Sequence, residues 1–226
     1  MGLSFDGIDD KISFGDLAAL DAPSAFSVAF WAQPKAGVAV NDSFFSKKPS
    51  NTTGFDIQAG EADATRLSFQ IQPGATRGDI AGAMTADVWQ HQMWVYNGGG
   101  AANADRLKLW LNGVAQTLSF TGTIPASITD SGTAAVMVAN SAINPVLFMP
   151  VWMAHLMVWT VALSDDHAAS QCRSRRPIWF SNLLIWTPLD DGTLAQDYSG
   201  SENHGTVTGA LSEESPIGAG FPVHTF

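Results

Sequence analysis

The sequence contains a single cysteine, Cys172, and few basic residues. One cysteine forms no disulfide within the chain and supplies no cysteine-based zinc site. Eleven lysine and arginine residues stand against 21 aspartate and glutamate residues, which gives a net charge of -10. A surface of this charge repels a phosphate backbone and an anionic lipid surface. We therefore expect no nucleic acid and no membrane among the partners.

A secretory signal and a long apolar run are also missing. Residues 1–20 carry four aspartates and a lysine, where a signal peptide has a basic region followed by an apolar one. The longest apolar stretch, 145–163, is interrupted by Pro150, His155 and Thr160, so we expect no membrane insertion. These absences predict a chain that folds in the cytoplasm before it reaches a virion or the cell exterior.

Short apolar runs with period two dominate what is present. Examples are FSVAFWAQP (26–34) and RLSFQIQPG (66–74), which are bounded by glycine, proline, asparagine or aspartate. In LKLWLNGVAQTLSF (107–120), two such runs flank Asn112 and Gly113, a pair typical of tight hairpin turns. The pattern predicts an all-β fold, a two-sheet antiparallel jelly-roll sandwich.

One segment has the signals of a helix. Ser164 is placed as an N-cap, acidic residues follow it, and three arginines precede Pro177. These charges complement the helix dipole at both ends. We expect one short helix near 165–175, with the arginines acting as C-terminal caps.

Five segments together resemble the laminin-G-like, concanavalin A-like jelly-roll domain, in its bacterial and phage form. They are LSFDGIDDKISF (3–14), FSVAFWAQP (26–34), LKLWLNGVAQ (107–116), AHLMVWTVALSDDH (154–167) and LLIWTPLDDGTLAQDYSGSENHGTV (183–207). In many such modules the last block precedes the first. The resemblance therefore implies one domain over 1–211 in permuted order, whose block 183–211 closes on the N-terminal strand, followed by a tail at 212–226.

Two acidic turns carry the candidate metal ligands. FDGIDD (5–10) is interpreted as a hairpin turn that joins strands 3–6 and 11–14 and is capped by its aspartates. Relatives often hold calcium, which prefers oxygen ligands, and this implies a structural calcium ion as the minority alternative. No cofactor is required. The candidate ligands are Asp6, Asp9, Asp10, Asp190 and Asp197, which would form one site if the two turns meet.

Carbohydrate binding is the common non-catalytic task of the family, and it needs exposed aromatic rings. Most aromatic residues lie on strand patterns and are expected in the core. Tyr96 and Tyr198 lie next to loops and are the candidate ligand-binding residues. The late strand around 153–161 is apolar on both faces. Its residues Met153, His155, Met157 and Trp159 form either a subunit interface or a face covered by the helix or the C-terminal tail.

Catalytic patterns are missing. The chain has four glutamates, Glu61, Glu202, Glu213 and Glu214, and no two of them are spaced as a glycosidase pair on one strand. The sequence predicts a non-enzymatic structural or adhesion protein. It would belong to a larger assembly such as a bacteriophage virion, as a decoration or surface protein, with protein partners or self-assembly and with glycan binding. The alternatives are a calcium-assisted, carbohydrate-binding lectin module of a secreted protein and a glycoside hydrolase.

Overall fold

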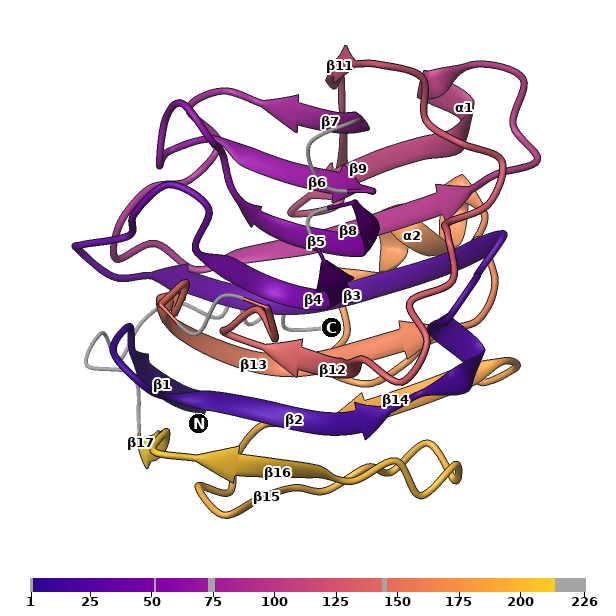
Figure 1. Cartoon of the computed structure of the whole chain (residues 1–226). Coiled ribbons are helices and arrows are strands. Elements are labelled where there is room, and N and C mark those ends of the chain that lie inside the picture. The colour runs from indigo at the N-terminus through magenta and orange to yellow at the C-terminus, as the bar shows by residue number, and fades with distance from the viewer. Residues whose placement is uncertain (1, 51, 73–75, 144–145, 214–226) are drawn as a thin grey trace.

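The computed structural model describes residues 2–50, 52–72, 76–143 and 146–213, which form two facing β-sheets (Figure 1). The strands are β1 (Gly2–Asp6), β2 (Lys11–Asp16), β3 (Ala25–Pro34), β4 (Ser43–Ser50), β5 (Thr53–Ala59), β6 (Leu67–Ile71), β7 (Thr76–Ile80), β8 (Gln90–Asn97), β9 (Leu107–Leu111), β10 (Val114–Gln116), β11 (Ser119–Thr121), β12 (Ala135–Val138), β13 (Pro150–Trp159), β14 (Leu183–Thr187), β15 (Leu194–Ala195), β16 (Gly205–Thr208) and β17 (Leu211–Glu213). The helical segments are η1 (Ala18–Leu20), α1 (Asn103–Arg106) and α2 (Asp165–Gln171).

The two sheets divide the chain in a way that mixes early and late segments. Sheet A has the order β10-β9-β8-β3-β13-β1-β17, and β14 pairs with the remaining part of β13. Sheet B has the order β11-β7-β6-β5-β4-β12-β2-β16-β15. Every strand pair is antiparallel. The predicted two-sheet antiparallel jelly-roll sandwich with one short helix near 165–175 is confirmed.

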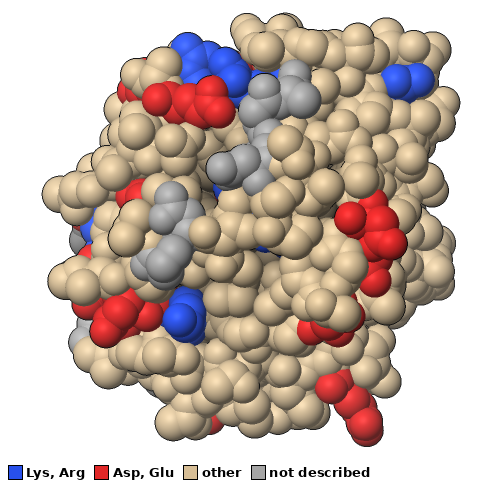
Figure 2. Space-filling view, in the orientation of Figure 1, with Lys and Arg blue, Asp and Glu red and all other residues tan. Residues whose placement is uncertain are grey.

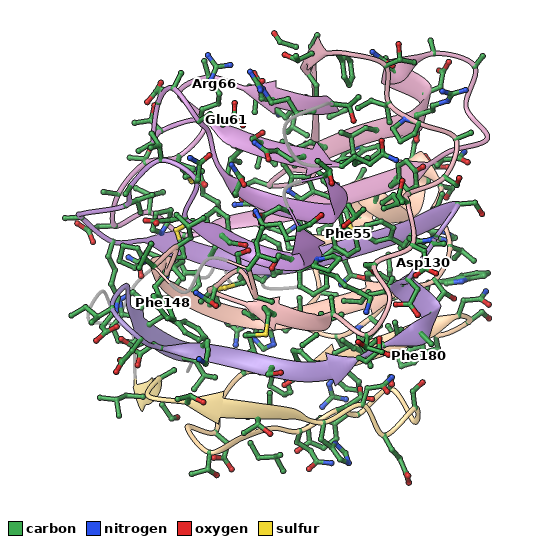
Figure 3. The ribbon with its side chains drawn as sticks, in the orientation of Figure 1. Phe55, Glu61, Arg66, Asp130, Phe148 and Phe180 are labelled. Atoms are coloured by element: carbon green, nitrogen blue, oxygen red, sulfur yellow. The ribbon has the colours of Figure 1, made fainter. Side chains whose placement is uncertain are left out.

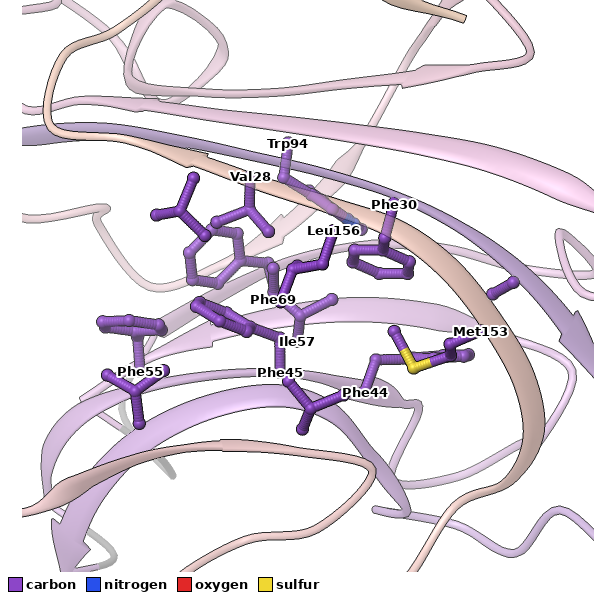
Figure 4. Close-up of a cluster of buried hydrophobic side chains, with 14 of the residues drawn as sticks. Val28, Phe30, Phe44, Phe45, Phe55, Ile57, Phe69, Trp94, Met153 and Leu156 are labelled. Atoms are coloured by element: carbon purple, nitrogen blue, oxygen red, sulfur yellow. The ribbon is translucent and has the colours of Figure 1, made fainter. Parts of the chain in front are cut away.

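The main core lies between the sheets and is rich in aromatic rings (Figure 4). Phe26 from sheet A contacts Phe55 and Phe69 from sheet B, with ring centroids 4.7 Å and 5.8 Å apart. Phe69 also meets Trp94 edge to face at 5.6 Å. All four side chains are almost fully buried, so this cluster ties the two layers together.

Local turn and cap chemistry follows the sequence closely. Asn112 and Gly113 both have positive φ, 51° and 80°, and form the two-residue turn that connects β9 to β10. Ser164 caps α2, because its side chain accepts a hydrogen bond from the His167 amide. The helix ends at Gln171, earlier than the predicted residue 175.

The acidic turn at the N-terminus is not a hairpin, and this prediction is wrong. The predicted strands 3–6 and 11–14 are present as β1 and β2, but β1 pairs with β13 and β17 in sheet A, whereas β2 pairs with β12 and β16 in sheet B. The turn therefore carries the chain from one layer to the other. The alternation of apolar residues predicts two strands, but it does not say whether they pair with each other.

The interface predicted on the late strand is also corrected. A bulge at His155, where φ is 54°, interrupts the alternation of β13. As a result Met153 faces the main core, whereas Met157 and Trp159 face outward. The outward pair is buried under α2 and its neighbours, and His155 is half-buried. The part of the apolar outer face around Met157 and Trp159 is thus covered within the chain by the helix and its neighbours, as the alternative interpretation proposed.

The C-terminal block lies beside the N-terminal strands. β17 pairs with β1, and β16 pairs with β2, so residues 205–213 extend both sheets (Figure 1). Most of the predicted tail, residues 214–226, lies outside the described residues. Among the helices that the structure describes, none has the length and apolar character to span a membrane.

Candidate functional site: an exposed aromatic surface

An exposed group of aromatic rings surrounds Tyr198, which the sequence singled out. Tyr198 is 55% exposed, and its ring centroid lies 5.8 Å from that of the half-buried Trp186. Phe180, labelled in Figure 3, is 64% exposed and its ring meets that of Trp186 edge to face at 6.5 Å. We call Phe180, Trp186 and Tyr198 the aromatic surface. Two exposed rings that adjoin a half-buried third form an apolar patch on the surface.

Trp186 lies on β14, and Tyr198 lies on a following loop that is hydrogen-bonded back to β14. The amide of Tyr198 donates to the carbonyl of Trp186 at 2.8 Å, so the two residues are locked side by side. Ser199 and Asn203 donate from their side chains to the Leu184 carbonyl. The aromatic surface therefore rests on a pinned backbone, which lowers the conformational entropy that a bound ligand must remove.

Polar groups border the rings. Ser201 and Glu202 are exposed on the loop that follows Tyr198, and the Ser201 hydroxyl donates to the Leu183 carbonyl. Asn182, also exposed, immediately precedes β14. On the other side of Phe180, Trp179 is 39% exposed and its ring lies 4.8 Å from that of His167. Rings for stacking thus adjoin hydroxyl, carboxylate and amide groups that can bond to a polar ligand.

Sequence reasoning missed Phe180 and Trp186, since tryptophans on strand patterns were expected in the core. The sequence LLIWT (183–187) is apolar at its first four positions, so its pattern gives no signal that one face is exposed. In the structure, Leu183, Ile185 and Thr187 are buried, while Leu184 and Trp186 are only half-buried, as on a strand with one solvent-facing side.

The second candidate, Tyr96, is not a ligand-binding residue. Its side chain is fully buried in the main core and its hydroxyl donates to the Pro125 carbonyl at 2.9 Å. Burial raises its pKa to about 12. Tyr96 lies next to a loop in sequence, but its position on β8 points the ring between the sheets. The prediction for Tyr96 is therefore wrong.

The acidic turn brings three of the five predicted metal ligands together. Carboxylate oxygens of Asp6, Asp9 and Asp10 all lie within 4.8 Å of one another. Asp6 accepts hydrogen bonds from the Ile8 and Asp9 amides, and Asp10 accepts one from the Asp6 amide at 2.8 Å. Burial raises the pKa of Asp10, and the charges of Asp6 and Asp9 add to the effect. The carboxylate oxygens and the crowded negative charge of these three aspartates fit a hard cation such as calcium. The hydrogen bonds show that Asp6 and Asp10 also close the turn.

The other two predicted ligands do not join this group. Asp197 is buried, and it accepts four hydrogen bonds, from the amides of Trp186, Ser199 and Asn203 and from the Ser199 hydroxyl. Four donors use the acceptor positions of a carboxylate, so Asp197 is an organiser of the loop and not a metal ligand. Asp190 is exposed and, among the described residues, lies outside the acidic cluster.

The outer face of sheet B carries a group of carboxylates that are paired with cations. Asp79 is paired with Arg66 and Arg77, and Arg77 also contacts Glu61 at 2.8 Å (Figure 3). Asp56, fully buried, is paired with Lys48. Figure 2 shows the same face with acidic and basic side chains scattered over a mostly uncharged surface. Carboxylates neutralised in this way lack the free pair that a glycosidase places across the sugar bond.

The fold and its sequence blocks define a concanavalin A-like β-sandwich. The chain belongs to the concanavalin A-like lectin/glucanases superfamily, whose family model matches residues 6–169. The aromatic surface lies beyond the matched range. No curated protein matches the sequence.

Solved structures share the fold at low sequence identity. A Bacteroides ovatus protein proposed to bind carbohydrate aligns with a TM-score of 0.68 and 14% identity, over 93% of this chain and 58% of its own length. The CBM40 module of a Ruminococcus gnavus sialidase, solved with α2,3-sialyllactose, gives 0.54 and 13%, over 75% and 94% of the two chains. Domain 4 of the Geobacillus stearothermophilus arabinanase AbnA, solved with arabinotriose, gives 0.51 and 15%, over 74% of each.

Proposed function

We propose that the protein is a non-catalytic carbohydrate-binding module and that its aromatic surface stacks against sugar rings. The observation that carries the proposal is the exposure of Phe180 and Tyr198, whose rings both adjoin that of Trp186 on β14. Modules of the same fold, solved with arabinotriose or sialyllactose, support the ligand class.

The chemistry of the surface suits a saccharide. The C–H faces of a sugar ring are apolar and pack on aromatic rings, while its hydroxyl groups bond to polar neighbours such as Ser201 and Glu202. Loss of one well-placed ring typically costs about 1–2 kcal/mol of binding free energy, which corresponds to roughly 5–30-fold in Kd.

A glycan array, run with and without EDTA, tests the ligand class. We expect binding to one or more glycans, and the EDTA arm shows whether the calcium-assisted alternative is needed. The absence of binding to every glycan would refute the proposed function.

Substitution of the rings tests the surface separately from the function. The highest-affinity glycan is titrated into Trp186→Ala, Tyr198→Ala and Phe180→Ala, each of which is expected to weaken binding. Val40→Ala, at a 41% exposed residue between β3 and β4, serves as the matched control and should bind as the wild type does. If the wild-type protein binds a glycan and the double variant Trp186→Ala/Tyr198→Ala binds it equally well, carbohydrate binding stands and this surface is the wrong site.

The predicted role in a larger assembly such as a virion stays a prediction. One of the features that favoured it, the apolar outer face of β13, is covered within the chain at Met157 and Trp159. Size-exclusion chromatography with light scattering tests it: a clean monomer with no affinity for any particle would count against assembly.

A further inference from the structure

The outer face of sheet A has two apolar halves. One half, around Met157 and Trp159, is packed beneath α2 and the segments beside it. The other half is a separate cluster of Trp31, Trp89, Trp152 and Ala154, which we call the tryptophan cluster. Its indole side chains point away from the core between the sheets, because their strand neighbours Phe30 and Val151 fill that core.

The tryptophan cluster is shielded from water on the outer face of sheet A. Trp31, Trp89 and Trp152 are 4%, 8% and 7% exposed. Lys35 lies over the Trp152 ring, with its Nζ 4.8 Å from the centroid, and is fastened there by the Ser4 hydroxyl and the Phe5 carbonyl. Among the residues that the structure describes, no partly buried apolar side chain packs against these rings, in contrast to the other two clusters.

The register of sheet A shows where the C-terminal chain leaves it. Residues that pair across neighbouring strands form one row over the sheet. In this row Glu213 on β17 pairs with Gly2 on β1, and the β1–β13 register places Ala154 of β13 next. Ala154 pairs with Trp31 on β3, which in turn pairs with His91 on β8. The last described residue of β17 therefore lies on the same cross-sheet row as two members of the tryptophan cluster. Three strand spacings separate β17 from β3, which is about 14 Å at about 4.8 Å per strand.

The segment that follows has the reach and the composition to cover the cluster. Residues 214–226 read ESPIGAGFPVHTF, with Ile217, Phe221, Val223 and Phe226 as large apolar side chains. An extended chain spans at most roughly 3.3–3.6 Å per residue, so the reach of these 13 residues is about three times the distance to β3. The core side of the sheet is filled, and a chain leaving β17 can cross only the outer side.

We propose that segment 214–226 packs across the outer face of sheet A and covers the tryptophan cluster in the same molecule. The segment would then cover this half of the outer face, as α2 covers the other half. This occupancy is independent of the carbohydrate-binding surface, which lies on β14 and its loop.

Site-specific photo-crosslinking in the full chain tests the proposal. A photoreactive benzoylphenylalanine replaces Phe221, and crosslinked peptides are identified by mass spectrometry. We expect intramolecular crosslinks to β3 or β13, in the segments that carry Trp31 and Trp152. The same group at Leu194, an exposed residue on β15 at the edge of sheet B, is the matched control and should not reach these segments. Crosslinks only to other segments, crosslinks only between two molecules, or no crosslinks at all would overturn the proposal.

Tryptophan fluorescence gives a second readout that does not depend on crosslinking. The triple variant Ile217→Ser/Phe221→Ser/Phe226→Ser keeps the chain length and removes the apolar contacts. We expect a red-shifted emission and a larger acrylamide-quenched share, because up to three of the eight tryptophans gain contact with water. Val40→Ser/Val114→Ser, at two other exposed residues, is the control and should leave both quantities unchanged. Emission and quenching equal to the wild type in the triple variant would also overturn the proposal.

Discussion

Lowering the pH should destabilise the protein through His91, a buried histidine on the outer side of β8. His91 is 1% exposed, its ring meets Trp31 edge to face at 5.3 Å, and its Nδ1 has no hydrogen-bond partner among the described residues. Burial lowers its pKa to about 3, and the nearby His155 adds to the effect. The folded protein therefore keeps His91 neutral at pH values where the unfolded chain protonates it.

The sign and the size follow from proton linkage. Below a pKa of about 6.5 the unfolded chain binds a proton that the folded protein does not, so the free energy of unfolding falls as the pH falls. At pH 5 the solution is about 1.5 pH units below the histidine pKa of about 6.5 in the unfolded chain. At 1.36 kcal/mol per unit, the free energy of unfolding is therefore lower by about 2 kcal/mol. The loss continues as the pH approaches about 3, the pKa of His91 in the folded protein.

The assay compares the wild type with His91→Gln by urea unfolding at pH 7.5 and pH 5.0. Asp42 acts in the opposite direction, because burial raises its pKa to about 6, but it is present in both proteins and cancels in the comparison. We expect the drop in the free energy of unfolding between the two pH values to be about 2 kcal/mol smaller in the variant. An equal drop in both proteins would refute the assignment of this pH dependence to His91.

Three further predictions concern stability and are measured by chemical denaturation. Phe69→Ala should lower the free energy of unfolding by about 3–5 kcal/mol, because the ring is fully buried between Phe26, Phe55 and Trp94; a loss below about 1 kcal/mol would contradict this packing. Gly54→Ala should cost at least about 1–2 kcal/mol, since Gly54 has a φ of 82° and an added Cβ would press against a backbone carbonyl; wild-type stability would show that the turn relaxes freely. Asp10→Ala should cost about 1–3 kcal/mol in EDTA, because it leaves the Asp6 amide without its acceptor, whereas a loss seen only with calcium would assign the acidic turn to a metal.

Local features could be predicted from the sequence because their causes lie within a few residues. The positive φ accessible to Asn112 and Gly113 suits the hairpin turn, and the hydroxyl of Ser164 caps the helix that follows it. Period-two alternation identified most strands, and the combination of these blocks was enough to indicate the family. None of these inferences requires knowledge of which segments meet in space.

The candidate site could be predicted only in part, because exposure depends on distant segments. Tyr96 and Tyr198 both adjoin loops, but β8 turns the first into the core and the loop fastened to β14 leaves the second in water. Asp197 resembles a metal ligand in sequence, and only the fold shows that three amides and a hydroxyl already occupy its carboxylate.

The sequence by itself determined the strand content, the local turns and the family of this protein, since alternation and turn chemistry act over short distances. Three features are visible only in the tertiary structure. β1 and β2 belong to different sheets, and the bulge at His155 moves Met153 to the opposite face from Met157. Phe180 and Trp186 join Tyr198 at the surface. The physical reason is that a strand pattern defines two faces, whereas the partner strands and covering segments, far away along the chain, decide what each face meets.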